Sequence, residues 1–138
     1  MGNSEVGHLN IGAGRIVYQD LARINKACDD GTIDTNSEII KTFNYVKEND
    51  KALHLIGLVS DGGIHSHLKH LYKLCELSNQ HDIDKIYIHA FTDGRDCDPK
   101  SGKTFIENLE KNMYNAKIAT LCGRYFAMDR DNRWDRIK

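Results

Sequence analysis

The sequence has no surplus of charge of one sign. Its 138 residues include 19 Lys and Arg against 20 Asp and Glu, which gives a formal net charge of -1. Proteins that bind nucleic acids or membrane surfaces through their overall field usually carry an excess of basic residues. The composition therefore favours neither partner, and any site for an anion has to be local.

Long apolar runs and paired cysteines are also missing. No run approaches the roughly 20 apolar residues of a membrane span, and no signal-peptide core precedes a cleavage site. The cysteines form no Cys-x-x-Cys pair, so neither a zinc knuckle nor a redox motif is indicated. We expect free thiols in a cytoplasmic protein. The cysteines are Cys28, Cys75, Cys97 and Cys122.

What the sequence does contain is three short apolar runs, each followed by turn residues. They span residues 52–60, 85–92 and 116–122. Their ends lie about 30 residues apart, the length of a strand–helix unit that leads to a parallel strand. The first run is continuous enough to predict a strand buried on both sides. The pattern predicts an α/β protein, layered α/β/α, with a mainly parallel sheet.

Amphipathic segments alternate with these runs. Apolar residues at helical spacing predict helices over residues 20–28, from Asn36 or Ser37 onward, over 68–77, and after Pro99. Pro99 would occupy the first helical turn, where its missing N–H costs nothing. Gly102 should weaken that helix.

In open parallel sheets, ligands bind beyond the carboxyl ends of the strands. Each predicted strand here is followed by a loop with residues that a phosphorylated acid would need. His65 can donate to an anion or shuttle a proton. Arg95 offers a planar fork for carboxylate or phosphate, and Asp96 could accept from substrate hydroxyls. Arg124 and Arg130 are six residues apart and could bracket one anion.

Each of these residues also has a plain structural interpretation: a solvent-facing histidine, an arginine–aspartate surface pair and a solvated charge run. A metal site among the histidines of residues 65–70 is not favoured, because side chains at i and i+2 of a helix diverge. A calcium loop at residues 129–132 is not favoured either, since the glycine of an EF-hand loop is absent.

In the N-terminal stretch, residues 1–15, the chemistry narrows to one group, the hydroxyl of Ser4. Gly2 and Gly7 would let the backbone turn sharply and approach a ligand. A helix starting at Ser4 would direct its free N–H groups toward an anion on that hydroxyl, such as a phosphoryl group. The plain alternative is a turn followed by an N-capped helix. As a nucleophile, Ser4 would need a base or a metal ion beside it.

Four motifs occur in order along the chain. They are MGNSEVGHLNIGAGR at residues 1–15, VSDGGIHSH at 59–67, HAFTDGRD at 89–96 and GRYFAMDRDNRW at 123–134. Together they resemble the cofactor-independent phosphoglycerate mutase family, whose members do not use 2,3-bisphosphoglycerate. These enzymes combine a metal-binding domain related to alkaline phosphatases with an inserted transferase domain.

The resemblance implies that the chain is a fragment of a larger enzyme, which we expect to be a monomer. Residues 1–18 would be the remnant of the metal-binding domain with the nucleophile turn. Residues 19–138 would be the N-terminal part of an incomplete, substrate-binding transferase domain. The complete enzyme would be an isomerase of glycolysis and gluconeogenesis.

The resemblance also implies roles for individual residues. Ser4 would take the phosphoryl group from 3-phosphoglycerate, return it as 2-phosphoglycerate, and bind one of two manganese ions. Asp96 would bind substrate and move a proton on the glycerate hydroxyls. The other residues that match substrate-binding positions are His65, Arg95, Arg124 and Arg130.

Two alternatives stay open. One is a related phosphatase or phosphopentomutase with the same metal domain, and the other is a non-catalytic module that binds phospho-acids through its arginine loops. The family's other metal ligands and later cationic residues have no matching positions here. We therefore expect the isolated chain to be catalytically silent.

Overall fold

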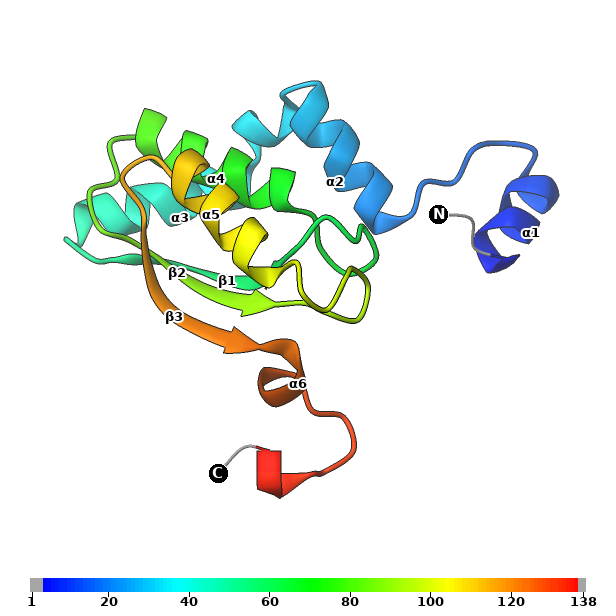
Figure 1. Ribbon diagram of the computed structural model, residues 1–138. Helices are drawn as coiled ribbons and strands as arrows, with labels where there is room; N and C mark the ends of the chain where they lie inside the picture. The colour runs from blue at the N-terminus through cyan, green and yellow to red at the C-terminus, as the bar shows by residue number, and fades with distance from the viewer. Residues whose placement is uncertain (1–3, 137–138) are drawn as a thin grey trace.

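The structure, a computed structural model, describes residues 4–136. Figure 1 shows the course of the chain. Its elements are α1 (Ser4–Ala13), α2 (Asp20–Asp29), the 3-10 turn η1 (Thr32–Thr35), α3 (Ser37–Glu48), β1 (Leu53–Val59), α4 (Leu68–Gln80), β2 (Ile86–Thr92), α5 (Gly102–Asn112), β3 (Lys117–Gly123), α6 (Arg124–Ala127) and the 3-10 turn η2 (Trp134–Arg136). Within residues 4–136, no helix is long and apolar enough to cross a membrane.

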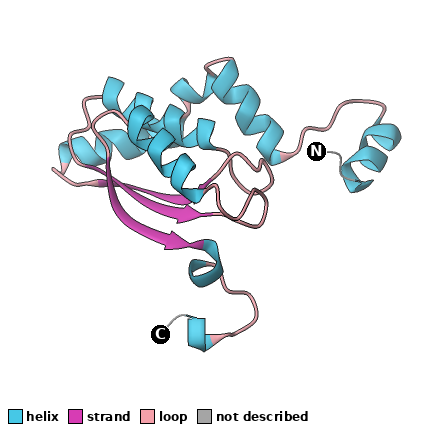
Figure 2. Cartoon of the chain, viewed as in Figure 1, coloured by secondary structure: helices cyan, strands magenta, loops and turns pink. Residues whose placement is uncertain are grey.

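The three strands form one parallel sheet in the order β1-β2-β3, seen in magenta in Figure 2. In its register, Val59 lies opposite Thr92 and Thr92 lies opposite Gly123. The last residues of the three strands are therefore level, and the loops that follow them start from the same edge. The predicted α/β class and parallel sheet are confirmed.

Helices α3, α4 and α5 lie on one face of this sheet, and α2 packs against α4 (Figure 1). Because the strand order follows the chain order, successive right-handed crossovers return on the same side, which places α4 and α5 together. The described residues do not form the second helical layer of the predicted α/β/α arrangement. The prediction that the first strand is buried on both sides is wrong, since Ile56 on the bare face is 70% exposed.

One apolar core lies between the covered face of the sheet and the helices. Side chains of β2 alternate, so that Ile86, Ile88 and Ala90 point into the core. Full burial of an aliphatic or aromatic side chain stabilises a fold by roughly 1.5 to 3 kcal/mol. The helices contribute Phe43 and Val46 from α3, and Phe105 and Leu109 from α5.

The four cysteines all lie in the described part of the chain and are free, as predicted. Cys75 on α4 is fully buried, and burial raises the pKa of its thiol to about 11. This cysteine acts as a small core residue, because a thiol that resists ionisation is a poor nucleophile.

Helix α5 begins later than the sequence predicts. Pro99 lies in a turn before the helix and not in its first turn, because the Asp98 carboxylate accepts from Lys100 N and the Asp98 carbonyl accepts from Ser101 N. Gly102 opens the helix, where the cost of a glycine is small. A Cβ there would meet the Thr92 side chain at 3.4 Å, so Gly102 lets α5 pack against the end of β2.

Asn36 is the N-cap of α3, one of the two predicted candidates. Its side-chain oxygen accepts from Glu38 N at 3.0 Å and from Ile39 N at 3.2 Å. Replacing it by alanine leaves these donors without the cap, so Asn36→Ala should lower the free energy of unfolding by about 1 kcal/mol. Urea denaturation of the 138-residue protein measures this.

The matched control is Asn44→Ala, an exposed position within the same helix. It removes no cap and should leave the free energy of unfolding unchanged or slightly higher, because alanine favours helix. Equal destabilisation by the two variants would contradict the capping role of Asn36.

Candidate functional site

The three loops that follow the strands meet at one edge of the sheet, as predicted. Gly62 in the first loop lies so close to the second that a Cβ there would be 2.7 Å from the carbonyl oxygen of Asp96. No real Cβ tolerates this distance, so only glycine lets the loops pack this closely. The close backbone approach at Gly62 is therefore made to the chain itself.

Arg124 is the centre of this edge. It directly follows β3, and its side chain is only 11% exposed. Its Nη1 donates to Asp96 Oδ2 at 2.6 Å and to Asp93 Oδ1 at 3.0 Å. The hydrogen bond to Asp96 and the one to Asp93 raise the pKa of the guanidinium, although burial opposes them. Its charge is shared by two carboxylates from the loop after β2.

His65 lies at the rim of this cluster. Its Nε2 is 3.9 Å from Asp96 Oδ2, which is longer than a hydrogen bond, and its side chain is 53% exposed. The imidazole is thus positioned to turn toward either Asp96 or a ligand. The structure brings His65, Asp96 and Arg124 together from the segments that follow the three strands; the third of these segments begins with α6 and not with the predicted loop.

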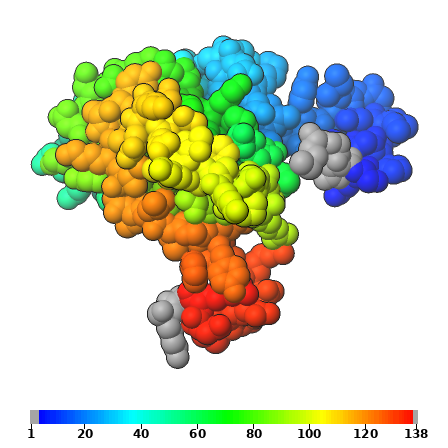
Figure 3. Space-filling view, in the orientation of Figure 1, coloured from blue at the N-terminus to red at the C-terminus, as the bar shows by residue number. Residues whose placement is uncertain are grey.

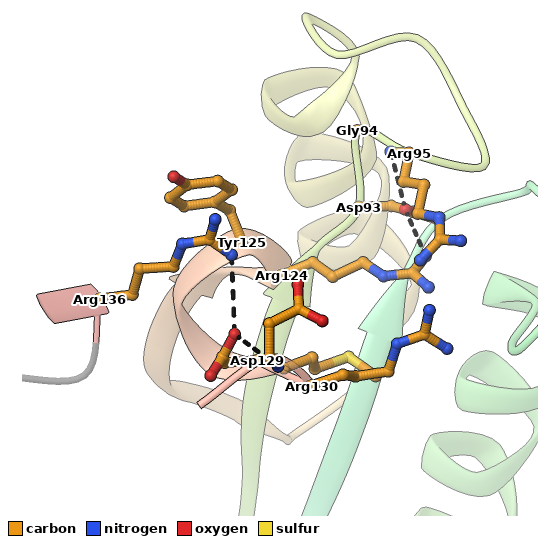
Figure 4. A pocket seen from close by; sticks show the side chains of 10 residues that line it. Asp93, Gly94, Arg95, Arg124, Tyr125, Asp129, Arg130 and Arg136 are labelled. Atoms are coloured by element: carbon orange, nitrogen blue, oxygen red, sulfur yellow. Dashed lines mark hydrogen bonds and ion pairs between the residues drawn. The ribbon is translucent and has the colours of Figure 1, made fainter. Parts of the chain in front are cut away.

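A cavity of about 260 Å³ opens beside Arg124 (Figure 4). Arg95, Arg124 and Arg130 all line it, and in Figure 4 their guanidinium groups point to the same side. Binding sites for drug-sized ligands usually start near 300 Å³, so this one suits a small anion. Its lining residues are Asp93, Gly94, Arg95, Arg124, Tyr125, Met128, Asp129, Arg130, Asp131 and Arg136.

Asp129 organises the loop that carries Arg130. Its carboxylate accepts from Arg133 N at 2.7 Å and from Asp131 N at 3.2 Å. Burial acts to raise its pKa, but these N–H groups and the nearby arginines hold the pKa below the usual range. The resulting turn fixes the backbone on both sides of Arg130.

Two residues of this region were missed by the sequence reasoning. Arg136 lies 3.7 Å from Asp129 Oδ1, and its guanidinium carbon is 3.9 Å from the ring centre of Tyr125. The six-residue spacing of Arg124 and Arg130 repeats at Arg136, which was the available signal. Asp93 is the other, and no spacing in the sequence distinguishes it from its neighbour Asp96.

Ser4 is not part of this cluster. It is the exposed first residue of α1, as predicted, and its Oγ is 3.5 Å from His8 Nδ1. In Figures 1 and 3, α1 stands apart from the sheet and its helices. Gly7 lies inside this helix and not at a turn, while the predicted turn at Gly2 falls outside the described residues.

The residues around Ser4 do not by themselves form a metal site. Ser4 offers a single hydroxyl oxygen, whereas divalent ions take several oxygen or nitrogen ligands. Within residues 4–136, no group of three or more His, Cys, Asp or Glu could hold an ion. A metal bound at Ser4 would need ligands from residues other than these.

Comparison with known proteins identifies the family of this chain. The model described as "BPG-independent PGAM N-terminus" matches residues 24–138. A 2,3-bisphosphoglycerate-independent phosphoglycerate mutase of Bacteroides thetaiotaomicron is 59% identical over the whole chain, and one of Parabacteroides distasonis is 61% identical. The chain spans 28% of the length of each of these two relatives.

A solved structure agrees with these matches. The crystal structure of a Leishmania mexicana phosphoglycerate mutase, determined at low cobalt concentration, superposes with a TM-score of 0.82 and 36% identity. The match covers 99% of this chain and 27% of that one. On these grounds the chain belongs to the 2,3-bisphosphoglycerate-independent phosphoglycerate mutase family.

Proposed function

We propose that the complete protein interconverts 3-phosphoglycerate and 2-phosphoglycerate through a phosphorylated Ser4. The observation that carries this proposal is the set of three arginines, Arg95, Arg124 and Arg130, around one small cavity in a chain of this family. Phosphoglycerates carry a carboxylate and a phosphate, and the arginine fork fits both groups.

In the proposed reaction, Ser4 Oγ attacks the phosphorus of 3-phosphoglycerate. The bond from phosphorus to the 3-oxygen of glycerate breaks, and that oxygen takes up the proton lost by the serine. The 2-hydroxyl of glycerate then gives up its proton and attacks phosphoserine, and Ser4 Oγ regains a proton as it leaves. Asp96 is the proposed carrier of the proton on the glycerate hydroxyls, because a carboxylate can serve as a general base.

The remaining residues hold the glycerate while the phosphoryl group is on Ser4. We assign this binding role to His65, Arg95, Arg124 and Arg130, together with Asp96. Each arginine can make charge-assisted hydrogen bonds to the acid, which contribute roughly 1.5 to 3 kcal/mol apiece. Holding the glycerate also keeps it from being lost to solvent between the two half-reactions.

This mechanism requires Ser4 to approach the arginines, which it does not do in the structure. The segment between α1 and α2 contains no helix or strand, and Gly14 ends α1 with φ +59°. We propose a domain boundary here, with residues 1–18 belonging to the metal-binding part and residues 19–138 to the substrate-binding part. The start of the family match at residue 24 supports it.

The described residues do not supply a ligand set for a metal ion, so no step of the proposed reaction is assigned to one. The two manganese ions implied by the resemblance stay a prediction for the complete protein, as do its monomeric state and its cytoplasmic location. When bound, such an ion would lower the effective pKa of the serine hydroxyl.

The test is to supply the complete protein with 3-phosphoglycerate and a divalent metal, without 2,3-bisphosphoglycerate. ³¹P NMR distinguishes the two phosphomonoesters and inorganic phosphate in one spectrum. We expect 2-phosphoglycerate to accumulate to equilibrium. Release of inorganic phosphate alone would instead support the phosphatase alternative and overturn the proposal.

Arg124→Ala in the complete protein should raise the KM for 3-phosphoglycerate about 10- to 100-fold, because a charge-assisted hydrogen bond to the acid is lost. Arg124→Lys should recover only part of this, since a lysine lacks the planar fork. Steady-state kinetics measure both variants.

The control is Arg23→Ala. Arg23 is an exposed arginine on α2 that pairs with Asp20 on the same helix, and it does not line the cavity. Its loss should leave KM unchanged. A similar rise in KM for Arg23→Ala would mean that the effect comes from total charge and not from Arg124.

A further inference from the structure

We infer that Asp93 is a positioning residue, which holds the Arg124 guanidinium in the arrangement that binds the substrate. The inference rests on the proposed function of the cavity. Asp93 acts on the substrate through its neighbours and not by direct contact.

Asp93 joins the ends of all three strands. Its Oδ2 accepts from the hydroxyl of Ser60, which follows β1, at 2.8 Å. Its Oδ1 accepts from Arg95 N at 3.1 Å and Asp96 N at 3.2 Å, in the loop after β2. The same oxygen accepts from Arg124 Nη1, after β3, at 3.0 Å. One carboxylate therefore fixes three loops relative to one another.

The burial of Asp93 shows that these contacts are an integral part of the fold. The side chain is 2% exposed, and Ser60 is fully buried. A buried carboxylate without partners is very unfavourable, so its four donors are needed to keep it there. Burial acts to raise the pKa of Asp93, but the donors from Arg95, Ser60, Asp96 and Arg124 hold the pKa below the usual range.

Asp93 and Asp96 are not equivalent partners of Arg124. Asp93 is saturated by protein donors, two of which are backbone N–H groups that cannot leave. Asp96 Oδ2 is bonded to Arg124 and faces His65 at the rim, so it can exchange partners when an acid enters. Asp93 would then be the fixed anchor that keeps the Arg124 guanidinium aimed at the cavity during that exchange.

A double-mutant cycle in the complete protein tests this. Asp93→Asn keeps the shape but removes the charge, and it should raise the KM for 3-phosphoglycerate about tenfold, with kcat changed less than about threefold. In an Arg124→Ala background the same substitution should change KM by less than about twofold, because the residue through which it acts is gone. An equal factor in both backgrounds would reduce Asp93 to a structural role and overturn the inference.

A second variant covers the case in which Asp93→Asn fails to fold, as judged by circular dichroism. Ser60→Ala removes one donor to Asp93 and should raise KM about threefold, an effect that should also vanish in the Arg124→Ala background. Equal factors in the two backgrounds would again contradict the inference. Failure of the proposed function is seen separately, as a wild-type protein that does not interconvert the phosphoglycerates.

Discussion

Ser4→Ala in the complete protein is expected to abolish the interconversion of phosphoglycerates, with a loss in kcat of more than about 10³-fold. The proposed mechanism has no other route for the phosphoryl group, since the serine oxygen is its only carrier between the two positions of glycerate. Removing a covalent nucleophile typically costs several orders of magnitude in rate. The binding of 3-phosphoglycerate should change far less, because the proposed binding role belongs to the arginines and not to Ser4.

Two measurements check this expectation. ³¹P NMR follows turnover, and a brief exposure to ³²P-labelled substrate followed by denaturation reports phosphate attached to the protein. Ser37→Ala is the matched control, since Ser37 is also an exposed serine at the first position of a helix. It should keep both the turnover and the label. A Ser4→Ala protein that retains more than about a hundredth of wild-type kcat would contradict the role of Ser4.

The 138-residue chain on its own is expected to show no isomerase activity, even with manganese. It spans 28% of the length of the Bacteroides and Parabacteroides relatives, and its described residues contain no cluster that could hold a metal ion near Ser4. Helix α1, which begins at Ser4, also stands apart from the sheet and its helices (Figures 1 and 3). Effective catalysis needs the reacting groups within near-attack distance, which the chain alone does not provide.

The comparison is between the isolated chain and the complete protein at equal concentration, under the same metal and substrate conditions. The complete protein should convert 3-phosphoglycerate while the isolated chain leaves it unchanged over the same time. Manganese-dependent formation of 2-phosphoglycerate by the purified 138-residue chain would show that residues 1–138 already contain a working site.

Much of the fold follows from local patterns in the sequence. The apolar runs predicted all three strands to within a residue or two, because β1, β2 and β3 each place apolar side chains in one core. The single helical layer could not be predicted in the same way. It depends on the order in which the strands join the sheet, and a run such as that of β1 looks the same whether one or both of its faces are covered.

The location of the candidate site was predictable, but the pattern of hydrogen bonds within it was less so. Parallel strands bring their carboxyl ends to one edge, so the loops with Arg95 and Arg124 had to be neighbours. The division of labour between Asp93 and Asp96 was not predictable. It arises from which carboxylate is buried under the loops, and adjacent aspartates in a short turn carry no signal of that.

The pairing of Arg124 has a consequence for how a ligand is captured. The cluster contains four arginines at 95, 124, 130 and 136, and four aspartates at 93, 96, 129 and 131. Seen from a Debye length away, about 8 Å in physiological salt, these charges largely cancel. Long-range steering of an anion would therefore be weak, and the rate of encounter should depend little on ionic strength. Selection happens at contact, where an incoming acid has to exchange places with a carboxylate already in position.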